Sequence, residues 1–396
     1  MKPLTAALCL MGLLCLPATA QEKLDIFGYL ESQMVGTRLQ GKYFQWYTNK
    51  LRVDLKSQLT DSITFAANFD YITHHGKTRW NILDFLAADI TASIPPEMNP
   101  YYTLQFSDES FLDNAYLRLS LPQADLTLGK QQISVGTGYV WNPTDVFNIK
   151  DVLDPTYEQP GHNALRLDIP LGDLSGLTVL YSPEATWRES GKMLRWKGYL
   201  AHFDISLIAI ESCWTFRDYT RLDPGTGLFP EEPERRRLLG GSTAGELLGL
   251  GVWAEFAYNW MELSSDFYEL VAGANYTFDF QTFLMLEYYR NTLGKSDYKD
   301  YDLNDWMRFY AAEQKAIARD QLYLLVQHPA TDLLEVGLQT VFSISDSSLA
   351  LVPTLSYSLS NDVDVFAYLN LNLGRDGTVF AKQMGEGGLL RLRVYF

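Results

Sequence analysis

The sequence predicts an all-β fold, a transmembrane antiparallel β-barrel of about eighteen strands. Three observations lead to it. Many segments of about ten residues alternate apolar and polar side chains, no apolar run after residue 20 is long enough for a spanning helix, and the chain opens with the pattern of an export signal. A spanning helix needs about 20 apolar residues, whereas a tilted barrel strand crosses with about ten. We therefore expect this chain to cross a membrane with strands.

The first twenty residues have the three parts of a secretory signal. A basic start at Met1-Lys2 precedes an apolar stretch, and the pattern small-x-small ends at Ala20. We predict a signal peptide over 1–20 and a single barrel domain over 21–396. Cleavage would remove Lys2, change the formal charge from −16 to −17 and leave Cys213 as the last cysteine. A lone thiol cannot cross-link the fold, and an acidic chain lacks the basic face that nucleic acid requires.

Alternation with a period of two residues recurs along the chain. It is clearest in 51–56, 116–121, 165–169, 194–200 and 363–372, where one face is apolar and the other is charged or polar. Such segments are typical of barrel strands with a lipid-facing and a lumen-facing side. We predict strands over 24–34, 48–59, 62–73, 110–121, 124–134, 162–170, 176–183, 193–203, 205–216, 234–243, 248–259, 266–278, 281–290, 319–328, 332–344, 348–359, 363–373 and 387–396.

The strand 234–243 has only a weak alternating pattern. We predict it because an even number of strands must separate two loops on the same side of the membrane. Bacterial outer-membrane barrels have short turns on the periplasmic side, longer loops outside and both ends inside. Without this strand, three strands would separate the long stretches 217–246 and 291–318. An odd number of strands would place these two stretches on opposite sides of the membrane. Eighteen strands is thus our first choice and sixteen the second. Residues 305–318 are partly helical in pattern and are assigned to an outer loop.

The last strand carries a more specific pattern. Leu390, Leu392, Val394 and Phe396 lie on one face, with basic and aromatic residues between them. A terminal alternating strand that ends in Phe resembles the assembly signal of bacterial outer-membrane barrels. The resemblance implies location in the cell outer membrane of a Gram-negative-type bacterium. It also implies contact with outer-membrane lipid and recognition of Phe396 by the barrel-assembly machinery.

The third outer loop, between the fifth and sixth predicted strands, is unusually apolar. A loop that extends into water does not need such residues, so they predict that the loop folds inward and constricts the lumen, or else packs on the rim as a lid. We favour the inward fold. The candidate constriction residues are Tyr139, Trp141, Asn142, Asp145, Phe147, Asp151 and Asp154.

A second resemblance lies in the same region. The series Gly129-Lys130-Gln131, Asn142-Pro143-Thr144-Asp145 and Pro160-Gly161 resembles that of alginate-export-like and related outer-membrane channels. It covers roughly residues 110–185 and implies a channel without fixing its substrate. The chain departs from the pattern at Glu158-Gln159, where an acidic residue followed by Arg would be expected.

Alternation also predicts which charged side chains face the lumen. We expect basic residues on one arc of the wall and acidic residues on the other, so that the pore is polarised across its width. The alternative is that Asp54, Asp125 and Asp168 neutralise the basic arc. The candidate pore-lining residues are Arg52, Lys56, Tyr116, Arg118, Arg166, Arg195, Lys197, Arg391 and Arg393 on the basic side, and Glu255, Glu269 and Glu287, with Glu335 and Asp364, on the acidic side.

Motifs for catalysis, cofactors or metals are not found in the sequence. The adjacent His74 and His75 would point in opposite directions on a strand, and His162 has no Gly-x-Ser-x-Gly motif nearby. We therefore expect no catalytic residue, metal or cofactor. The expected function is a channel for passive diffusion of small hydrophilic solutes or a saccharide. An outer-membrane barrel enzyme, such as a lipid or peptide hydrolase, and a surface receptor or structural barrel are the alternatives.

Overall fold

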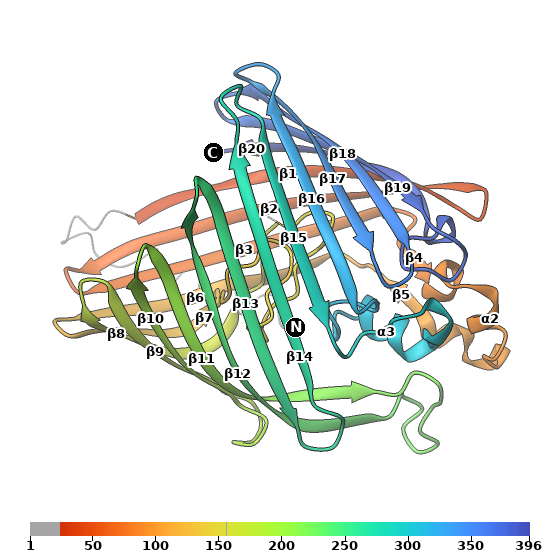
Figure 1. Ribbon diagram of the computed structural model, residues 1–396, viewed down its shortest axis with the longest axis horizontal. Coiled ribbons are helices and arrows are strands. Elements are labelled where there is room, and N and C mark those ends of the chain that lie inside the picture. The colour runs from red at the N-terminus through yellow and green to blue at the C-terminus, as the bar shows by residue number, and fades with distance from the viewer. Residues whose placement is uncertain (1–23, 156) are drawn as a thin grey trace.

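In a computed structural model, which describes residues 24–155 and 157–396, eighteen strands pair antiparallel into one closed sheet (Figure 1). The sheet closes where the first strand, β1, pairs with the last, β20, from Tyr29 opposite Tyr395 to Arg38 opposite Glu386. Closure leaves no unpaired sheet edge, which a membrane does not tolerate. The predicted signal peptide lies outside the described residues.

The strands agree with the predicted segments. The first nine barrel strands are β1 Leu24–Leu39, β2 Lys42–Thr60, β3 Ile63–Gly76, β6 Glu109–Leu121, β7 Ala124–Gln131, β8 His162–Gly172, β9 Ser175–Ser182, β10 Gly191–Leu200 and β11 Phe203–Arg217. The others are β12 Glu231–Leu247, β13 Leu250–Met261, β14 Phe267–Thr277, β15 Phe283–Asn291, β16 Asp320–Pro329, β17 Leu334–Ser343, β18 Ser348–Ser360, β19 Val363–Leu373 and β20 Glu386–Tyr395. The first choice of eighteen is confirmed, and the parity strand 234–243 lies within β12.

The two ends of the barrel differ. Short turns such as 61–62 and 361–362 lie at one end, and the long connections lie at the other, where Figure 1 shows α2 and α3. These connections contain the short strands β4 Arg79–Asn81 and β5 Thr103–Gln105, and the helices η1 Ile82–Phe85, α2 Ala88–Thr91, η2 Pro96–Tyr102, η3 Tyr298–Asp300, α3 Leu303–Tyr310 and η4 Lys382–Met384. The helical pattern predicted within 305–318 thus overlaps α3. Among the described residues, the helices are all too short or too polar to cross a membrane.

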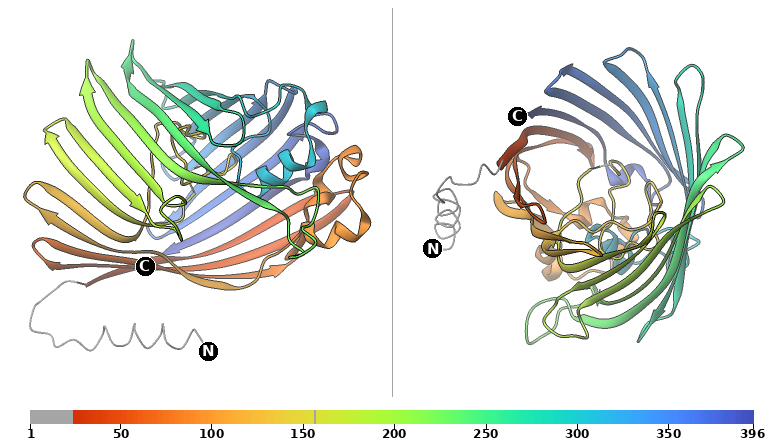
Figure 2. Two further views of the ribbon diagram at one scale, coloured as in Figure 1. Left: turned by 90° about the horizontal axis from the view of Figure 1, so that it is seen from below. Right: turned by 90° about the vertical axis from the view of Figure 1, so that its left-hand side faces the viewer.

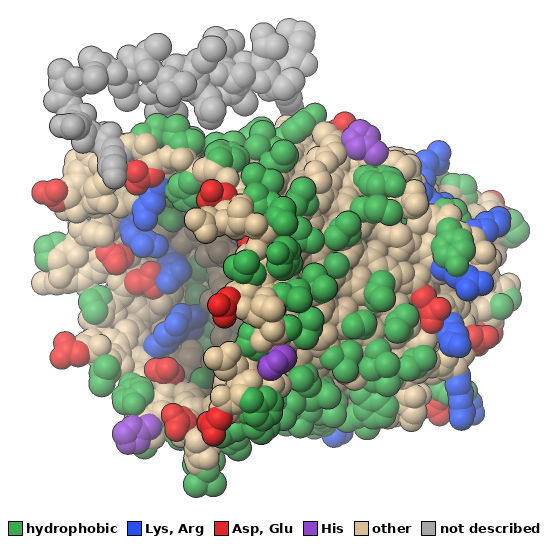
Figure 3. Space-filling model, turned by 90° about the horizontal axis from the view of Figure 1, so that it is seen from above, with side chains coloured by type: hydrophobic (Ala, Val, Ile, Leu, Met, Phe, Trp, Pro, Cys, Tyr) green, Lys and Arg blue, Asp and Glu red, His purple; other side chains and the backbone are tan. Residues whose placement is uncertain are grey.

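Apolar side chains cover the outer face of the barrel. Leu165, Leu207 and Leu239 are 42%, 56% and 55% exposed, although each lies in the middle of a strand. Successive side chains on a strand point to opposite faces, so their polar neighbours turn to the lumen. Figure 3 shows hydrophobic side chains across this face, with charged side chains gathered toward the two ends of the barrel.

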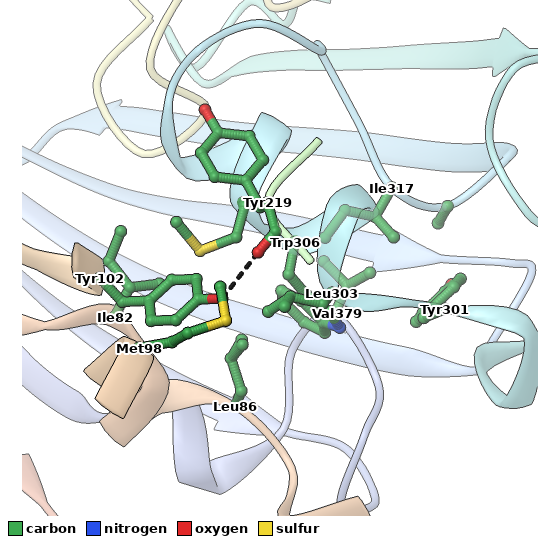
Figure 4. Close-up of a cluster of buried hydrophobic side chains, with 12 residues drawn as sticks. Ile82, Leu86, Met98, Tyr102, Tyr219, Tyr301, Leu303, Trp306, Ile317 and Val379 are labelled. Atoms are coloured by element: carbon green, nitrogen blue, oxygen red, sulfur yellow. Dashed lines mark hydrogen bonds between the residues drawn. The ribbon is translucent and has the colours of Figure 1, made fainter. Parts of the chain in front are cut away.

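The long connections pack on one another around a separate apolar cluster, which we call the loop cap (Figure 4). Trp306 and Leu303 of α3 contact residues from three other connections, among them Tyr102, Tyr219 and Val379. The Tyr102 hydroxyl donates a hydrogen bond of 2.6 Å to the backbone carbonyl of Tyr219. The connections at this end therefore form one packed layer.

Candidate functional site

The third long connection, residues 132–161, lies inside the barrel. We call it the inner loop. It leaves the wall at β7 and returns at β8, and the view along the barrel in Figure 2 (right) shows it within the ring of strands. The predicted inward fold is confirmed. Since the loop has few backbone hydrogen bonds of its own, the polar groups of the wall must satisfy its backbone.

One wall carboxylate holds the tip of the inner loop. Glu287 on β15 accepts hydrogen bonds from the backbone N–H groups of Tyr139 (2.6 Å), Val140 (2.9 Å) and Trp141 (3.1 Å). It also accepts the indole N–H of Trp253 at 2.8 Å. Four donors around one buried carboxylate satisfy its charge without a cation.

A second carboxylate holds the neighbouring turn. Glu255 on β13 accepts the backbone N–H groups of Thr137 (2.7 Å) and Thr144 (2.6 Å) and the Thr144 hydroxyl (2.8 Å). Gly136 has φ +94°, and a Cβ built there would lie 2.6 Å from the Glu255 carboxylate. Only glycine allows the backbone to approach the carboxylate this closely.

Three acidic residues that the sequence predicts to line the open pore, Glu255, Glu269 and Glu287, are instead buried. Glu255 and Glu287 point inward, as alternation predicted, but the inner loop covers them. Glu269 accepts the Tyr289 hydroxyl at 2.6 Å and lies 3.3 Å from the Lys315 ammonium. Each is at most 2% exposed. The prediction that they line the pore is corrected, because a strand pattern gives the face of a residue but not what packs against that face.

Apolar packing completes this attachment. The Trp141 ring stacks on Tyr289 with centroids 5.0 Å apart and an interplanar angle of 6°. Val140 and Trp141 belong to one buried cluster with Val271, Met285 and other residues of the wall. A polar barrel interior would not offer such a surface, so β13–β16 contribute apolar side chains to the lumen where the loop packs.

The returning limb of the inner loop is held by charge on the opposite side. Glu158 accepts hydrogen bonds from Lys50 (2.8 Å) and Arg52 (3.1 Å) of β2 and from the Tyr29 hydroxyl of β1 (2.8 Å). Burial opposes its ionisation, but the hydrogen bond and the charge of Lys50, together with Tyr29 and Arg52, hold the pKa of Glu158 below its usual value. Glu158 is thus the ionic contact between loop and wall on this side.

The same limb spans the closure of the barrel. Asp154 lies 2.8 Å from the Arg391 guanidinium of β20, and the Tyr157 hydroxyl donates to Glu31 of β1 at 3.1 Å. Glu31 in turn pairs with Arg393 of β20 at 2.6 Å. The limb therefore touches both strands that close the sheet.

Two other loop acids respond to burial differently. Burial raises the pKa of Asp145, although it accepts the backbone N–H groups of Phe147 (2.9 Å) and Asn148 (3.0 Å). Burial likewise raises the pKa of Asp151. These aspartates shape turns within the loop, because each accepts a hydrogen bond from a nearby backbone N–H.

Half of the predicted basic arc, Arg52, Arg166, Arg391 and Arg393, is paired with carboxylates. Arg52 lies 3.0 Å from Asp54 and 3.3 Å from Asp113, and Arg166 lies 2.7 Å from Asp168. These arginines therefore fit the alternative prediction, in which nearby carboxylates neutralise the basic arc. Of the other predicted residues, Lys56 and Arg118 are exposed and Tyr116 is half-buried.

Arg195 and Lys197 line a cavity at the short-turn end, with a volume of about 790 Å³. Arg166, Asp168 and Ser134 share its wall, and the Arg195 guanidinium donates to the Ser134 carbonyl at 3.5 Å. Here the structure brings three predicted basic residues together beneath the first part of the inner loop.

Several residues of this site are not among those predicted from the sequence. Lys50 and Glu31 lie on strand faces that alternation marks as inward, so that pattern could have identified them. Asp113 could not be found this way, because a β-bulge shifts the pairing of β3 with β6 between Asn68 and Phe69 and buries two successive residues, Asp113 and Asn114. Lys315 comes from a distant connection and gave no local signal.

Across residues 24–155 and 157–396, no group of three or more His, Cys, Asp or Glu side chains could hold a metal ion. His162 bonds to the Asn148 side chain at 3.0 Å. The buried wall carboxylates Glu255 and Glu287 bind the inner loop.

Solved structures with a similar fold are bacterial membrane barrels. The chain is similar to Acinetobacter baumannii OccAB4 with a TM-score of 0.56 and 10% identity over 95% of this chain and 98% of that chain. It also matches the outer-membrane protein OmpT of Vibrio cholerae, in the trimer form, with a TM-score of 0.47 and 10% identity over 95% and 100%. A mutant of the Rh. blastica porin gives 0.46 and 12% over 94% and 100%.

Sequence comparisons add no family. No protein-family model matches the chain, and no curated protein is significantly similar to it in sequence. The likeness to OccAB4 supports the closed barrel fold alone, and the resemblance to alginate-export-like channels is not shown by any of these matches.

Proposed function

We propose that this protein is an outer-membrane channel for the passive diffusion of small hydrophilic solutes or a saccharide. The observation that carries the proposal is the inner loop, which crosses the lumen from the Glu158 contacts on β1 and β2 to Glu255 and Glu287 on β13 and β15. A barrel of this size encloses more space than its own side chains fill, and a held loop narrows it. The function requires no catalytic group and no cofactor.

The outer surface supports location in the outer membrane. Exposed leucines in mid-strand suit contact with lipid, and the sheet has no edge to protect. Phe396 exchanges two backbone hydrogen bonds of 3.1 Å with Gly28, so the last residue extends the closing strand. Phe396 is 59% exposed, which suits recognition by the assembly machinery.

The inward carboxylates support a channel more than an enzyme. Glu255 and Glu287 are buried, and both of their carboxylate oxygens accept hydrogen bonds from N–H groups of the inner loop. A general acid or base needs a free position toward a substrate, which these groups do not offer. We therefore propose a non-enzymatic role.

The test is single-channel conductance of the purified protein in a planar bilayer, for the wild type and for the double variant Asp154→Asn, Glu158→Gln. We expect discrete steps in both, with a larger or more variable step in the variant, because its inner loop loses the ion pairs to Lys50 and Arg52 of β2 and to Arg391 of β20. Deletion of 139–158 should enlarge the step further. Absence of steps in all three would refute the channel and direct attention to hydrolase and receptor assays.

A further inference from the structure

A second cavity, of about 550 Å³, lies between the inner loop and the wall on the side of the long connections. Its wall includes Phe147 of the inner loop, Trp214, Arg236 and Phe267 of the barrel, and Glu313 from the connection between β15 and β16. It shares no lining residue with the cavity at Arg195 and Lys197. Its volume is in the range of small-molecule sites, which fits a solute of one or two sugar rings.

Aromatic rings form one part of this wall. Trp214 and Phe267 have ring centroids 5.4 Å apart, and the Arg236 guanidinium lies over both, 5.0 Å and 5.4 Å from their centroids. Trp214 lies on β11 and Phe267 on β14, and Arg236 of β12 packs against both rings. Phe267 is only 5% exposed, whereas Trp214 is half-buried, so Trp214 offers the flat apolar surface that a solute can reach. The C–H face of a sugar ring is complementary to such a surface.

Two polar atoms of the same wall have no hydrogen-bond partner among the described residues. They are Nη2 of Arg236, a donor, and Oε2 of Glu313, an acceptor. Glu313 uses its other oxygen to accept the Tyr219 hydroxyl at 2.8 Å, and Arg236 uses Nε to donate to Asn259 at 2.7 Å. Nη2 of Arg236 is 3.7 Å from the Glu269 carboxylate, an ion pair too long for a hydrogen bond. A hydroxyl group both donates and accepts, so a polyhydroxylated solute can satisfy both atoms.

The charge of the cavity discriminates between solutes. Five carboxylate side chains line it, against two cationic ones, Arg236 and Lys315. Lys315 is already engaged by Glu269 and by the backbone carbonyl of Asn142 at 2.7 Å. An anionic solute would meet a net negative wall, since like charges in a cleft repel. The cavity therefore favours a neutral solute over an anionic one.

We propose that this cavity is a binding site for a neutral saccharide of one or two rings, which stacks on Trp214 and bonds to Arg236 and Glu313. The proposal rests on the proposed channel function and adds a substrate class to it. The solute would dwell above the inner loop before it passes.

The binding test is saturation-transfer NMR on the full barrel in detergent, with glucose, sucrose and glucuronate as probes. We expect saturable transfer to glucose and sucrose, and at least about 10-fold weaker binding of glucuronate, which carries one added charge. Trp214→Leu and Glu313→Gln should each weaken sucrose binding by about 10-fold, the effect of losing one ring contact or one charged hydrogen bond. Trp260→Leu is the matched control, since Trp260 is 45% exposed and lies on β13 away from this wall.

The conductance test separates this proposal from the channel itself. Sucrose should reduce the current through the wild type in a saturable way, and Glu313→Gln should shift the half-blocking concentration upward. Current steps without sucrose block or NMR binding would overturn the saccharide site and leave the channel standing. Saturable NMR binding without steps would support the site and refute the channel. Equal binding of glucose and glucuronate, or binding unchanged in both site variants, would overturn the proposal.

Discussion

The Glu158 carboxylate lies 2.8 Å from the Lys50 ammonium, and this pair joins the inner loop to β2. Arg52 and the Tyr29 hydroxyl contact the same carboxylate. On the far side the loop is held by hydrogen bonds to wall carboxylates and by apolar packing instead. The two attachments therefore differ in chemistry, and charge-removing substitutions should affect them separately.

The first prediction concerns Glu158→Gln. The glutamine amide has the shape of the carboxylate but lacks the negative charge to which Tyr29, Lys50 and Arg52 donate. The free energy that attaches the loop to β1 and β2 should therefore fall by about 2 kcal/mol. Hydrogen exchange of the inner-loop amides, followed by mass spectrometry, should become faster around residues 154–160 and unchanged around 139–141. Glu97→Gln, at an exposed position in another connection, is the control. Equal exchange in both variants would contradict the ionic attachment.

A second prediction follows from the lowered pKa of Glu158. A carboxyl whose pKa is lower in the folded loop contributes stability above its unfolded value, about 4.3, and this contribution is lost as pH falls through the folded pKa. Acidification below about pH 4 should therefore release the returning limb, seen as larger or noisier current steps. The Glu158→Gln variant should show these steps at neutral pH already. Wild-type steps that stay constant down to pH 3 would contradict this.

The third prediction concerns Glu287→Gln. In the variant, the side-chain NH2 group of glutamine replaces one carboxylate oxygen, and each oxygen of Glu287 accepts two N–H groups. Two hydrogen bonds are therefore lost, and N–H donors face one another. We expect the tip of the loop to be destabilised by about 3 kcal/mol, with faster amide exchange at 139–141. The control is Glu335→Gln, because Glu335 accepts a neutral donor, Gln327, at 2.9 Å. A larger effect in the control would rule out the proposed role of Glu287.

The fourth prediction tests the close approach at Gly136. Gly136→Ala places a Cβ 2.6 Å from the Glu255 carboxylate on a backbone with φ +94°. We expect a loss of about 3 kcal/mol from strain and from displacement of the carboxylate. Gly227→Ala is the matched control, since Gly227 has φ +67° and open space around it, and should cost about 1 kcal/mol. Urea unfolding of the refolded barrels gives both values, and similar losses would show that strain alone matters.

The barrel was predictable because its signal is local and repeated. Alternation in 51–56 or 363–372 depends only on one face meeting lipid and the other water, a condition that every strand of the wall meets on its own. Even β12, whose pattern is weak, followed from the requirement that long and short connections lie on opposite sides. The inner loop was predictable from its composition, because Val140 and Trp141 would otherwise be exposed to water.

The site depended on contacts that no local pattern encodes. Glu255 and Glu287 have the same inward alternation as a residue that lines water, yet they bind backbone N–H groups from more than a hundred residues away. Lys50, Glu158 and Arg391 meet only because the loop crosses to the closure of the sheet, and Asp113 turns inward only because of a bulge. The sequence by itself determined the strands and the side of each residue, since the membrane imposes these residue by residue. Only the tertiary structure decided which inward groups face solute and which hold the loop, because that depends on where one distant segment comes to rest.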